Sequence, residues 1–310
     1  MQWGHIKTLF ILSFLLLDIY LLLQFIDKTK EADFGILDRQ EASIEDQLQA
    51  ENISINADLE MNNVTEETYI LASQESFEEV EIAQLEGLKG QTSTVISNKF
   101  IVSQFDRPIA VDKDISQEGV NQLLVDKVLH YDAYTFWDWN KDLNIMIFFQ
   151  KQGIRPVYFN ENGILLVYLN SDNEMTHYTQ TLLGEPKPQG GGTKALIPPI
   201  EAIEVLYNNN HLKPDDAITD VGIGYYSRFT SEVEQVFAPT WRVTVNEERN
   251  YFVNAMEGFV FSSNDMTFLQ ETVSDIMMKL HALNDENEVK EPFLNILQQM
   301  LETENRSEEE

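Results

Sequence analysis

An apolar run near the N-terminus constrains this chain more than any other feature. Residues 8–26 read TLFILSFLLLDIYLLLQFI, with one charged residue. As a helix, this run would rise about 28 Å, close to the roughly 30 Å hydrocarbon thickness of a bilayer. The sequence therefore predicts a transmembrane helix at residues 8–26, preceded by a short cytoplasmic N-terminus at residues 1–7.

The charged residue of this run is Asp18, near its middle. A carboxylate at this depth makes membrane insertion less favourable by about 2.5–3.5 kcal/mol. Each leucine, isoleucine or phenylalanine around it makes insertion more favourable by about 0.3–0.6 kcal/mol, so the helix is expected to insert. A polar group in lipid needs a hydrogen-bond partner that a lone helix does not supply. We therefore expect Asp18 to face a helix of another protein. A tolerated polar residue bonded to its own backbone is the alternative.

Two other properties of the N-terminus bear on topology. A cleaved signal peptide fits poorly, because no small residues occupy the positions that a cleavage site requires. Lysines flank the run on both sides, so the positive-inside rule barely distinguishes the two orientations. Because long trailing domains cross a membrane largely regardless of charge, we expect an uncleaved single-pass anchor with the bulk of the chain outside the cell.

Composition narrows the function of the remaining residues. The formal net charge is −31 and there is no cysteine. A surface with this much negative charge repels nucleic acid and anionic lipid headgroups. The lack of cysteine excludes disulfides, thiolate metal sites and a cysteine nucleophile. The composition fits an extracytoplasmic body of a Gram-positive bacterium, which does not need disulfides at this length.

Hydrophobic periodicity predicts mixed helices and strands after a polar stalk at residues 27–40. A capped helical turn is expected at residues 43–48. The predicted helices are 77–88, 118–131, 199–208 and 265–283, and the predicted strands are 53–55, 69–72, 95–105, 143–150, 156–159, 164–169, 220–228, 233–237, 240–245, 251–254 and 259–262. Tight turns between neighbouring strands favour antiparallel meanders. The expected fold class is α+β.

Residues 184–194, GEPKPQGGGTK, are the best candidate boundary, because prolines and glycines there are expected to prevent regular structure. A helix followed by a meander occurs on both sides of it. We therefore predict a two-lobed body of antiparallel sheets with packed helices: lobe 1 at 41–185, a linker at 186–194, and lobe 2 at 195–283. The apparent repeat could equally be shared hairpin chemistry. Residues 284–310 form an acidic C-terminal segment with apolar residues at helical spacing from Phe293 to Leu301, and its last nine residues are expected to be disordered.

Motifs for chemistry are weak throughout. The five histidines lack metal-ligand spacing and are expected to be scattered surface residues. Order and spacing exclude a phosphate-binding loop at 184–194, and residues 170–174 fit a solvated turn better than a calcium loop. The aromatic residues Trp137, Trp139, Phe148, Phe149 and Trp241 could line a partner groove, but core packing is the simpler explanation. We predict no catalytic residues, no metal ligands and no cofactor.

Several short motifs in fixed order carry a family resemblance. They are QWGHIKTLFILSFLLLDIYLLLQF at residues 2–25, AIEVLY at 202–207, Leu212-Lys213, Gly224-Tyr225-Tyr226, APTWRV at 238–243, YFVNA at 251–255 and Gly258. This ordered set resembles proteins of the YycI (WalI) family from residue 1 to about residue 262. The stretch from Asn284 onward has no counterpart in the resemblance.

The resemblance implies a bitopic membrane protein of Gram-positive bacteria with a YycH/YycI-like α+β ectodomain. It further implies a non-enzymatic regulator of the WalK (YycG) sensor histidine kinase, which controls cell-wall homeostasis, acting with a YycH-like protein through transmembrane helices. In this sequence Phe14, Asp18, Leu22 and Phe25 fall roughly on one helical stripe and are the expected partner contacts. The alternatives are a membrane-anchored cell-wall hydrolase, which requires paired carboxylates in a cleft, and a ligand-binding or adhesion module.

Overall fold

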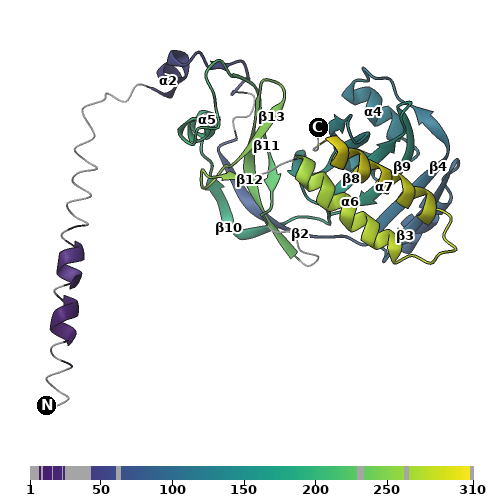
Figure 1. Ribbon diagram of the computed structural model, residues 1–310, viewed down its shortest axis with the longest axis horizontal. Coiled ribbons are helices and arrows are strands. Elements are labelled where there is room, and N and C mark those ends of the chain that lie inside the picture. The colour runs from purple at the N-terminus through teal and green to yellow at the C-terminus, as the bar shows by residue number, and fades with distance from the viewer. Residues whose placement is uncertain are drawn as a thin grey trace. The chain divides into compact units, whose positions relative to one another are not determined.

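The computed structural model describes residues 7, 10–15, 17–22, 24, 43–60, 64–228, 234–261 and 265–307, with side chains up to residue 300. The chain divides into two compact units, residues 1–52 and 53–310 (Figure 1). The second unit contains all of the strands given below.

The first unit is helical wherever its N-terminal residues are described, at 10–15 and 17–22 among others. No helix among the described residues combines the length and the apolarity required to cross a bilayer. Helix α2 (Ile44–Ala50) begins after Ser43, whose hydroxyl oxygen accepts a hydrogen bond from the backbone N–H of Asp46 at 3.2 Å. This cap confirms the helical turn predicted at residues 43–48.

The second unit alternates strands with short helices. Its strands are β1 (Ser54–Ile55), β2 (Glu66–Ser73), β3 (Gln91–Ile96), β4 (Phe100–Ala110), β5 (Tyr134–Asn140), β6 (Ile145–Gln152), β7 (Arg155–Tyr158), β8 (Ile164–Leu169), β9 (Glu174–Thr181), β10 (Lys187–Ala195), β11 (Ala217–Tyr226), β12 (Glu234–Val245), β13 (Arg249–Asn254) and β14 (Val260–Phe261). Its helices are α3 (Glu79–Glu86), α4 (Gln117–Leu124), a 3-10 turn η1 (Tyr131–Ala133), α5 (Pro199–Asn208), α6 (Asp265–His281) and α7 (Lys290–Ser307).

Most of these strands pair antiparallel. The pairing order is β10-β2-β12-β11-β7-β6-β8-β9-β4-β3, with β5 on β6, β13 on β12, β14 on β13 and β1 on β11. Among the strands of the described residues, only β1 and β7 run parallel to their neighbour β11. The fold is therefore mixed α+β around a large, mainly antiparallel sheet, as the sequence predicted.

Strand pairing crosses the lobe limits drawn from the sequence. Strand β2 precedes β3 in the chain, yet it pairs with β12 and β10. An ion pair between Arg155 of β7 and Glu67 of β2 adds a further link between distant segments. The division into lobes at 41–185 and 195–283 stays a prediction about domains.

Residues 187–195 form strand β10, so the expectation that prolines and glycines would prevent a strand there was wrong. Strand β10 pairs with β2, which offers its free edge, and the register shifts between Gln189 and Lys194. The shift is accommodated by glycines, since Gly190 has φ +82° and Gly192 has φ +142°. All nine residues of the strand are exposed. The glycines thus form a bulge within a strand.

Helix α4 is shorter than predicted. Ser116 caps it as expected, since its hydroxyl oxygen accepts a hydrogen bond from the N–H of Gly119 at 3.2 Å. The helix ends at Leu124, and Asp126 takes a left-handed conformation with φ 61°. Val128 and Leu129 are buried in the same cluster as Val120 and Leu124, so the apolar stripe continues through a turn.

Helices α6 and α7 cover one face of the sheet formed by β8, β9, β4 and β3 (Figure 1). Their buried residues share one cluster with strand residues such as Val102, Ile147 and Tyr168. In α7, Phe293 and Leu297 are fully buried. The C-terminal segment is therefore part of the main core. Its helix continues through residues 302–307, which were expected to be disordered.

The turn between α6 and α7 is fastened by polar contacts. The ammonium group of Lys290 donates to the carbonyl oxygen of Leu283 at 2.8 Å and contacts the Asp285 carboxylate at 2.5 Å. The amide of Asn287 donates to the hydroxyl oxygen of Thr94 in β3 at 3.0 Å. These contacts fix the helical hairpin against the edge of the sheet.

Candidate functional site

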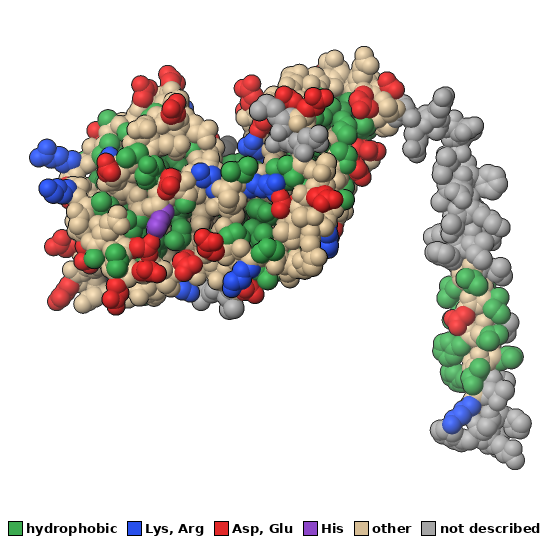
Figure 2. Space-filling view, turned by 180° about the vertical axis from the view of Figure 1, so that it is seen from behind, with side chains coloured by type: hydrophobic (Ala, Val, Ile, Leu, Met, Phe, Trp, Pro, Cys, Tyr) green, Lys and Arg blue, Asp and Glu red, His purple; other side chains and the backbone are tan. Residues whose placement is uncertain are grey.

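Three of the four predicted partner contacts lie in the described residues. Phe14 and Leu22 are each 57 % exposed, and Asp18 is exposed. Spacing of four residues places all three on one side of a helix. Figure 2 shows mostly hydrophobic side chains, with one acidic side chain among them, on the visible side of this segment. Phe25 lies outside the described residues, and the contacts of this stripe with another protein remain a prediction.

Metal and histidine chemistry has little support in the part of the chain that the structure describes. No group of three or more potential metal ligands occurs there. His130 and His281 are exposed and His211 is half-buried, in line with scattered histidines, and His5 lies outside the described residues. His177 is the exception. It is only 3 % exposed, so the prediction of a surface residue was wrong for it.

His177 lies on β9 beneath α7. Its ring stacks on the Phe293 ring at 4.9 Å between centroids, and neither ring nitrogen has a hydrogen-bond partner among the described residues. Burial lowers the pKa of His177 to about 4. Because protonation would place an unpaired charge in the core, the folded state holds this imidazole neutral.

Acid is therefore expected to weaken the fold through His177. The unfolded chain takes up a proton near the ordinary pKa of about 6.5, while the folded chain does not until about pH 4, so stability falls as pH drops through this window. Within this window, His177 alone changes the free energy of unfolding by up to about 1.4 kcal/mol per pH unit. Urea unfolding at several pH values should show a shallower loss for His177→Leu than for the wild type. A His281→Gln control should retain the wild-type slope, and equal slopes for His177→Leu and wild type would contradict this account.

The candidate partner-groove aromatics are mostly core residues. Trp139, Phe148, Phe149 and Trp241 are buried, as the simpler interpretation predicted. Trp137 is only partly buried, and the guanidinium carbon of Arg242 lies 5.5 Å from the centre of the Trp137 ring. Of the five, Trp137 alone lines one of the two clefts described below.

The predicted solvated turn at residues 170–174 is confirmed. The side-chain oxygen of Asn170 accepts hydrogen bonds from the N–H groups of Asp172 and Glu174, each at 3.0 Å. Its amide donates to the Glu174 carboxylate at 2.8 Å. This turn thus uses its own oxygens internally.

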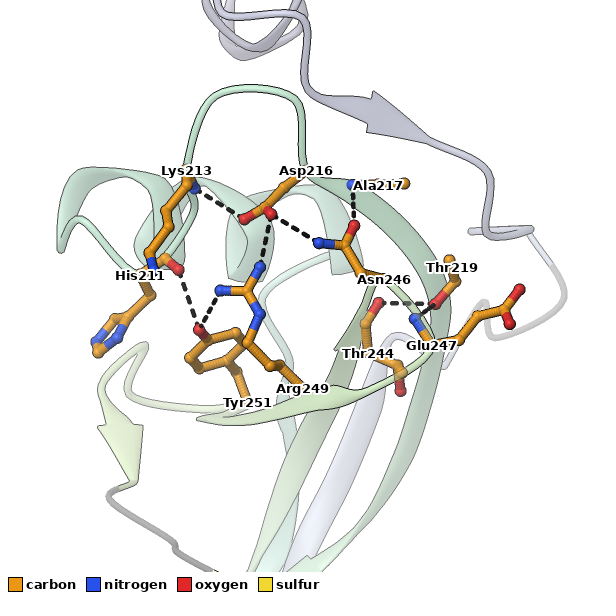
Figure 3. A network of polar contacts seen from close by, with 10 residues as sticks. All are labelled: His211, Lys213, Asp216, Ala217, Thr219, Thr244, Asn246, Glu247, Arg249 and Tyr251. Carbon is orange, nitrogen blue, oxygen red and sulfur yellow. Dashed lines mark hydrogen bonds and ion pairs between the residues drawn. The ribbon is translucent and has the colours of Figure 1, made fainter. Parts of the chain in front are cut away.

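A polar network joins the ends of β11, β12 and β13 (Figure 3). Its centre is Asp216, which lies just before β11 and is 5 % exposed. The Asp216 carboxylate accepts hydrogen bonds from Arg249 at 2.6 Å, Asn246 at 2.9 Å and the N–H of Lys213 at 2.8 Å. Burial alone would raise the pKa of Asp216, but these donors outweigh it and hold the pKa below its ordinary value.

The surrounding contacts of this network reach further strands. The side-chain oxygen of Asn246 accepts from the N–H of Ala217 at 2.8 Å, and the carbonyl oxygen of Asp216 accepts from the N–H of Ser54 in β1. Arg249 also donates to the Tyr251 hydroxyl at 3.1 Å. With so many internal partners, Asp216 fixes the loops at this end of the sheet, and sequence reasoning had no signal for it.

An acidic cleft of about 530 Å³ lies near the start of α6. Its lining includes Trp137, Asp138 and Asp265, together with Asp220, which pairs with Arg242. Burial raises the pKa of Asp265 above its ordinary value, the indole N–H of Trp137 opposes this through a 3.4 Å hydrogen bond, and the charge of Asp138 adds to the rise. A cleft in which a carboxylate with a raised pKa lies near another carboxylate is what the hydrolase alternative requires.

A larger groove of about 720 Å³ lies beside β10 and β12. Its apolar lining includes Tyr226, Phe259 and Phe261. Two cations, Lys194 and Arg228, also line it. So do two carboxylates, Glu234 and Glu257. A concave apolar surface with a few polar groups is the usual form of a small-ligand site.

The fold and these clefts define a mixed α+β protein with a mainly antiparallel sheet. The model of the YycI protein family matches residues 33–256, and the chain belongs to this family. The matched range stops before α6 and α7, which complete the core.

Comparison with solved structures gives distant similarities. A crystal structure of an uncharacterized protein from Eubacterium rectale is 10 % identical, with a TM-score of 0.41, over 69 % of this chain and 91 % of the other. YycH from Bacillus subtilis is 14 % identical, with a TM-score of 0.34, over 61 % of this chain and 53 % of YycH. The chain thus spans about half of YycH. Among curated proteins, no match was found.

Family membership supports a regulatory role in a two-component system. The YycI family is regulatory and has no known enzymatic activity. The particular kinase, the membrane contacts and the cellular location are matters of proposal.

Proposed function

We propose that this chain is a non-enzymatic regulator of the WalK (YycG) sensor histidine kinase, anchored in the cell membrane by residues 8–26 and acting with a YycH-like protein. Membership in the YycI family is the observation that carries the proposal. The short N-terminus is cytoplasmic and the α+β body is extracytoplasmic. A net charge of −31 and the absence of cysteine suit that location.

In the proposed mechanism, the anchor helix packs against the helices of the kinase and of the YycH-like protein. Phe14, Asp18 and Leu22, and Phe25 by sequence spacing, supply the contacts. Asp18 provides a hydrogen-bonding group inside the membrane, where a partner helix satisfies it. The body then favours one kinase state. A bias of about 1–3 kcal/mol changes an equilibrium about 5- to 150-fold, which is enough to control signalling.

Replacing residues 8–26 with an unrelated single-pass helix should abolish regulation, because the substitute retains the anchor and removes the contact stripe. Asp18→Leu should shift kinase output in the same direction without lowering protein abundance. Transcription of genes under the kinase's response regulator measures kinase output, and immunoblotting of membranes measures protein abundance. The control is Ile19→Leu, next to Asp18 and conservative in volume. Full regulation by the chimera would contradict the proposed mechanism.

Co-purification tests binding to the partners separately from kinase signalling. The full chain is expected to retain the kinase and the YycH-like protein when purified from detergent-solubilised membranes, and the chimera is expected to lose both. If the chimera retains both partners, the body rather than the anchor makes the contact.

A wall hydrolase remains the second candidate because of the acidic cleft. Its catalytic pair would be Asp265, whose pKa is raised, and Asp138 beside it. Purified full-length protein would then release soluble fragments from isolated cell walls, and Asp265→Asn would stop the release. Walls left intact by the wild-type protein would exclude this candidate.

A further inference from the structure

The aromatic groove beside β10 combines features that no regulatory contact proposed above explains. Tyr226 and Phe261 stack with ring centroids 4.4 Å apart, and Phe259 meets Phe261 edge-on at 5.1 Å. Val236 of β12 is 42 % exposed beside them. The groove therefore offers an apolar surface to a ligand side chain.

Two cations line this groove, and each lies against an aromatic ring. The guanidinium carbon of Arg228 is 4.3 Å from the Phe259 ring centre, and the Lys194 ammonium is 5.2 Å from the Tyr69 ring centre. Neither residue belongs to an ion pair between described residues. Stacking holds a guanidinium in place and leaves its N–H donors free in the plane of the group, suited to a carboxylate.

Two carboxylates line the same groove. One oxygen of Glu257 accepts a hydrogen bond from the Tyr69 hydroxyl at 2.9 Å, which fixes the side chain and leaves its second oxygen as an acceptor. Glu234, at the start of β12, is exposed. The groove thus carries two positive and two negative groups, in a chain whose net charge is −31. This local balance is a departure from the acidic surface elsewhere.

From this arrangement we propose that the groove binds short peptides with free termini and an apolar or aromatic side chain. The peptide carboxylate pairs with Arg228 and Lys194, its ammonium group with Glu234 and Glu257, and its side chain packs on Phe259 and Phe261. A purely anionic ligand would meet two carboxylates, and a purely cationic ligand two cations, so a zwitterion satisfies the lining best. A volume of about 720 Å³ lies within the range of known small-ligand pockets.

The edge strand gives this site an open side. Gly190 lines the groove, and a β-carbon placed on it would meet no atom within 4 Å. Its backbone is therefore accessible to an extended ligand, in the manner by which peptides pair with sheet edges. Strand β10 stands at the end of the pairing order, so its outer edge is unpaired among the described strands.

Calorimetric titration of the full-length chain in detergent micelles tests the proposal. The probes are tripeptides with glycine at both ends and a central phenylalanine, leucine or alanine, each with free termini and in an acetylated, amidated form. We expect the free phenylalanine and leucine peptides to bind, and capping to weaken binding by about tenfold or more. The alanine peptide should bind less tightly than both.

Variants locate the site. Arg228→Gln and Lys194→Gln should each weaken binding by about tenfold. Lys187→Gln is the matched control, since Lys187 is an exposed lysine of the same strand outside the groove lining. Unchanged thermal unfolding shows that each variant is folded, and Lys194, on an exposed edge, can be changed without touching the core.

Three results would overturn the proposal: no binding by any free peptide up to about 10 mM, equal binding of free and capped peptides, or unchanged binding by both groove variants. None of them affects the test of kinase regulation, which depends on the anchor helix. Conversely, a chimera that still regulates the kinase leaves the peptide titration unaffected.

Discussion

Phe293→Ala is expected to lower the free energy of unfolding by about 3–5 kcal/mol. Phe293 is fully buried in α7, meets the Tyr168 ring edge-on at 4.8 Å and stacks on His177 at 4.9 Å. Truncation removes these contacts and leaves a cavity between the helix and the sheet that the rigid strands cannot close. Urea unfolding of the full-length protein, followed by circular dichroism, measures the change.

The size of that effect decides whether α7 is a structural element or an appendage. Met278 of α6 is 66 % exposed, and Met278→Ala is expected to change stability by less than about 0.5 kcal/mol. An equally small change for Phe293→Ala would mean that α7 does not cover the sheet in solution. Loss of the full 3–5 kcal/mol would show that the family-matched range, residues 33–256, lacks part of its own core.

Asp216→Ala has the second largest expected effect, a loss of about 2–3 kcal/mol. The substitution removes the common acceptor of Arg249, Asn246 and the Lys213 N–H, and leaves the Arg249 cation without its partner. The Arg249 side chain is 33 % exposed, so water recovers part of the loss. Thermal and urea unfolding measure the change.

The pH dependence of the same network provides a second readout. Because the pKa of Asp216 is lowered in the folded state, its contribution is complete above the ordinary aspartate pKa and is lost as pH falls through the lowered value. The difference in stability between wild type and Asp216→Ala should therefore shrink in strong acid. Glu248→Ala, an exposed acid near the same hairpin, is the control and should have little effect at any pH. A constant difference at all pH values would contradict a charge-based role for Asp216.

Local patterns predicted several elements closely. Helix α5 occupies residues 199–208 as predicted, α6 ends two residues before the predicted limit of 283, and β8 is the predicted 164–169. In the two helices the apolar spacing repeats over two turns or more, and β8 is a continuous apolar run whose six residues are all buried. Such signals depend on neighbours in the chain, so the sequence contains them.

Non-local pairing explains part of the failures. Strand β10 was missed because it becomes a strand only beside β2, which is distant in sequence. Strands β5 and β9 were also missed, although they form local hairpins with β6 and β8. The predicted strand 95–105 is two strands joined by a turn at Ser97 and Asn98, both with positive φ. The two predicted strands 233–237 and 240–245 are one strand, β12, which continues through Pro239.

The candidate sites divide in the same way. Sequence spacing alone placed Phe14, Asp18 and Leu22 on one helical stripe, because a helix converts spacing into a face. Asp216, the acidic cleft and the aromatic groove had no sequence signal, since their residues come from segments far apart in the chain. For example, the groove joins Tyr69 to Glu257 through one hydrogen bond.

By itself, the sequence determined the apolar N-terminal run, the anionic and thiol-free character of the rest, and the periodicity of its strongest helices. All of these follow from composition and from neighbours within a few turns. The tertiary structure decided which strands became neighbours, that α6 and α7 complete the core, and where cations, carboxylates and aromatic rings converge. Those outcomes depend on burying apolar faces against partners that chain order does not specify.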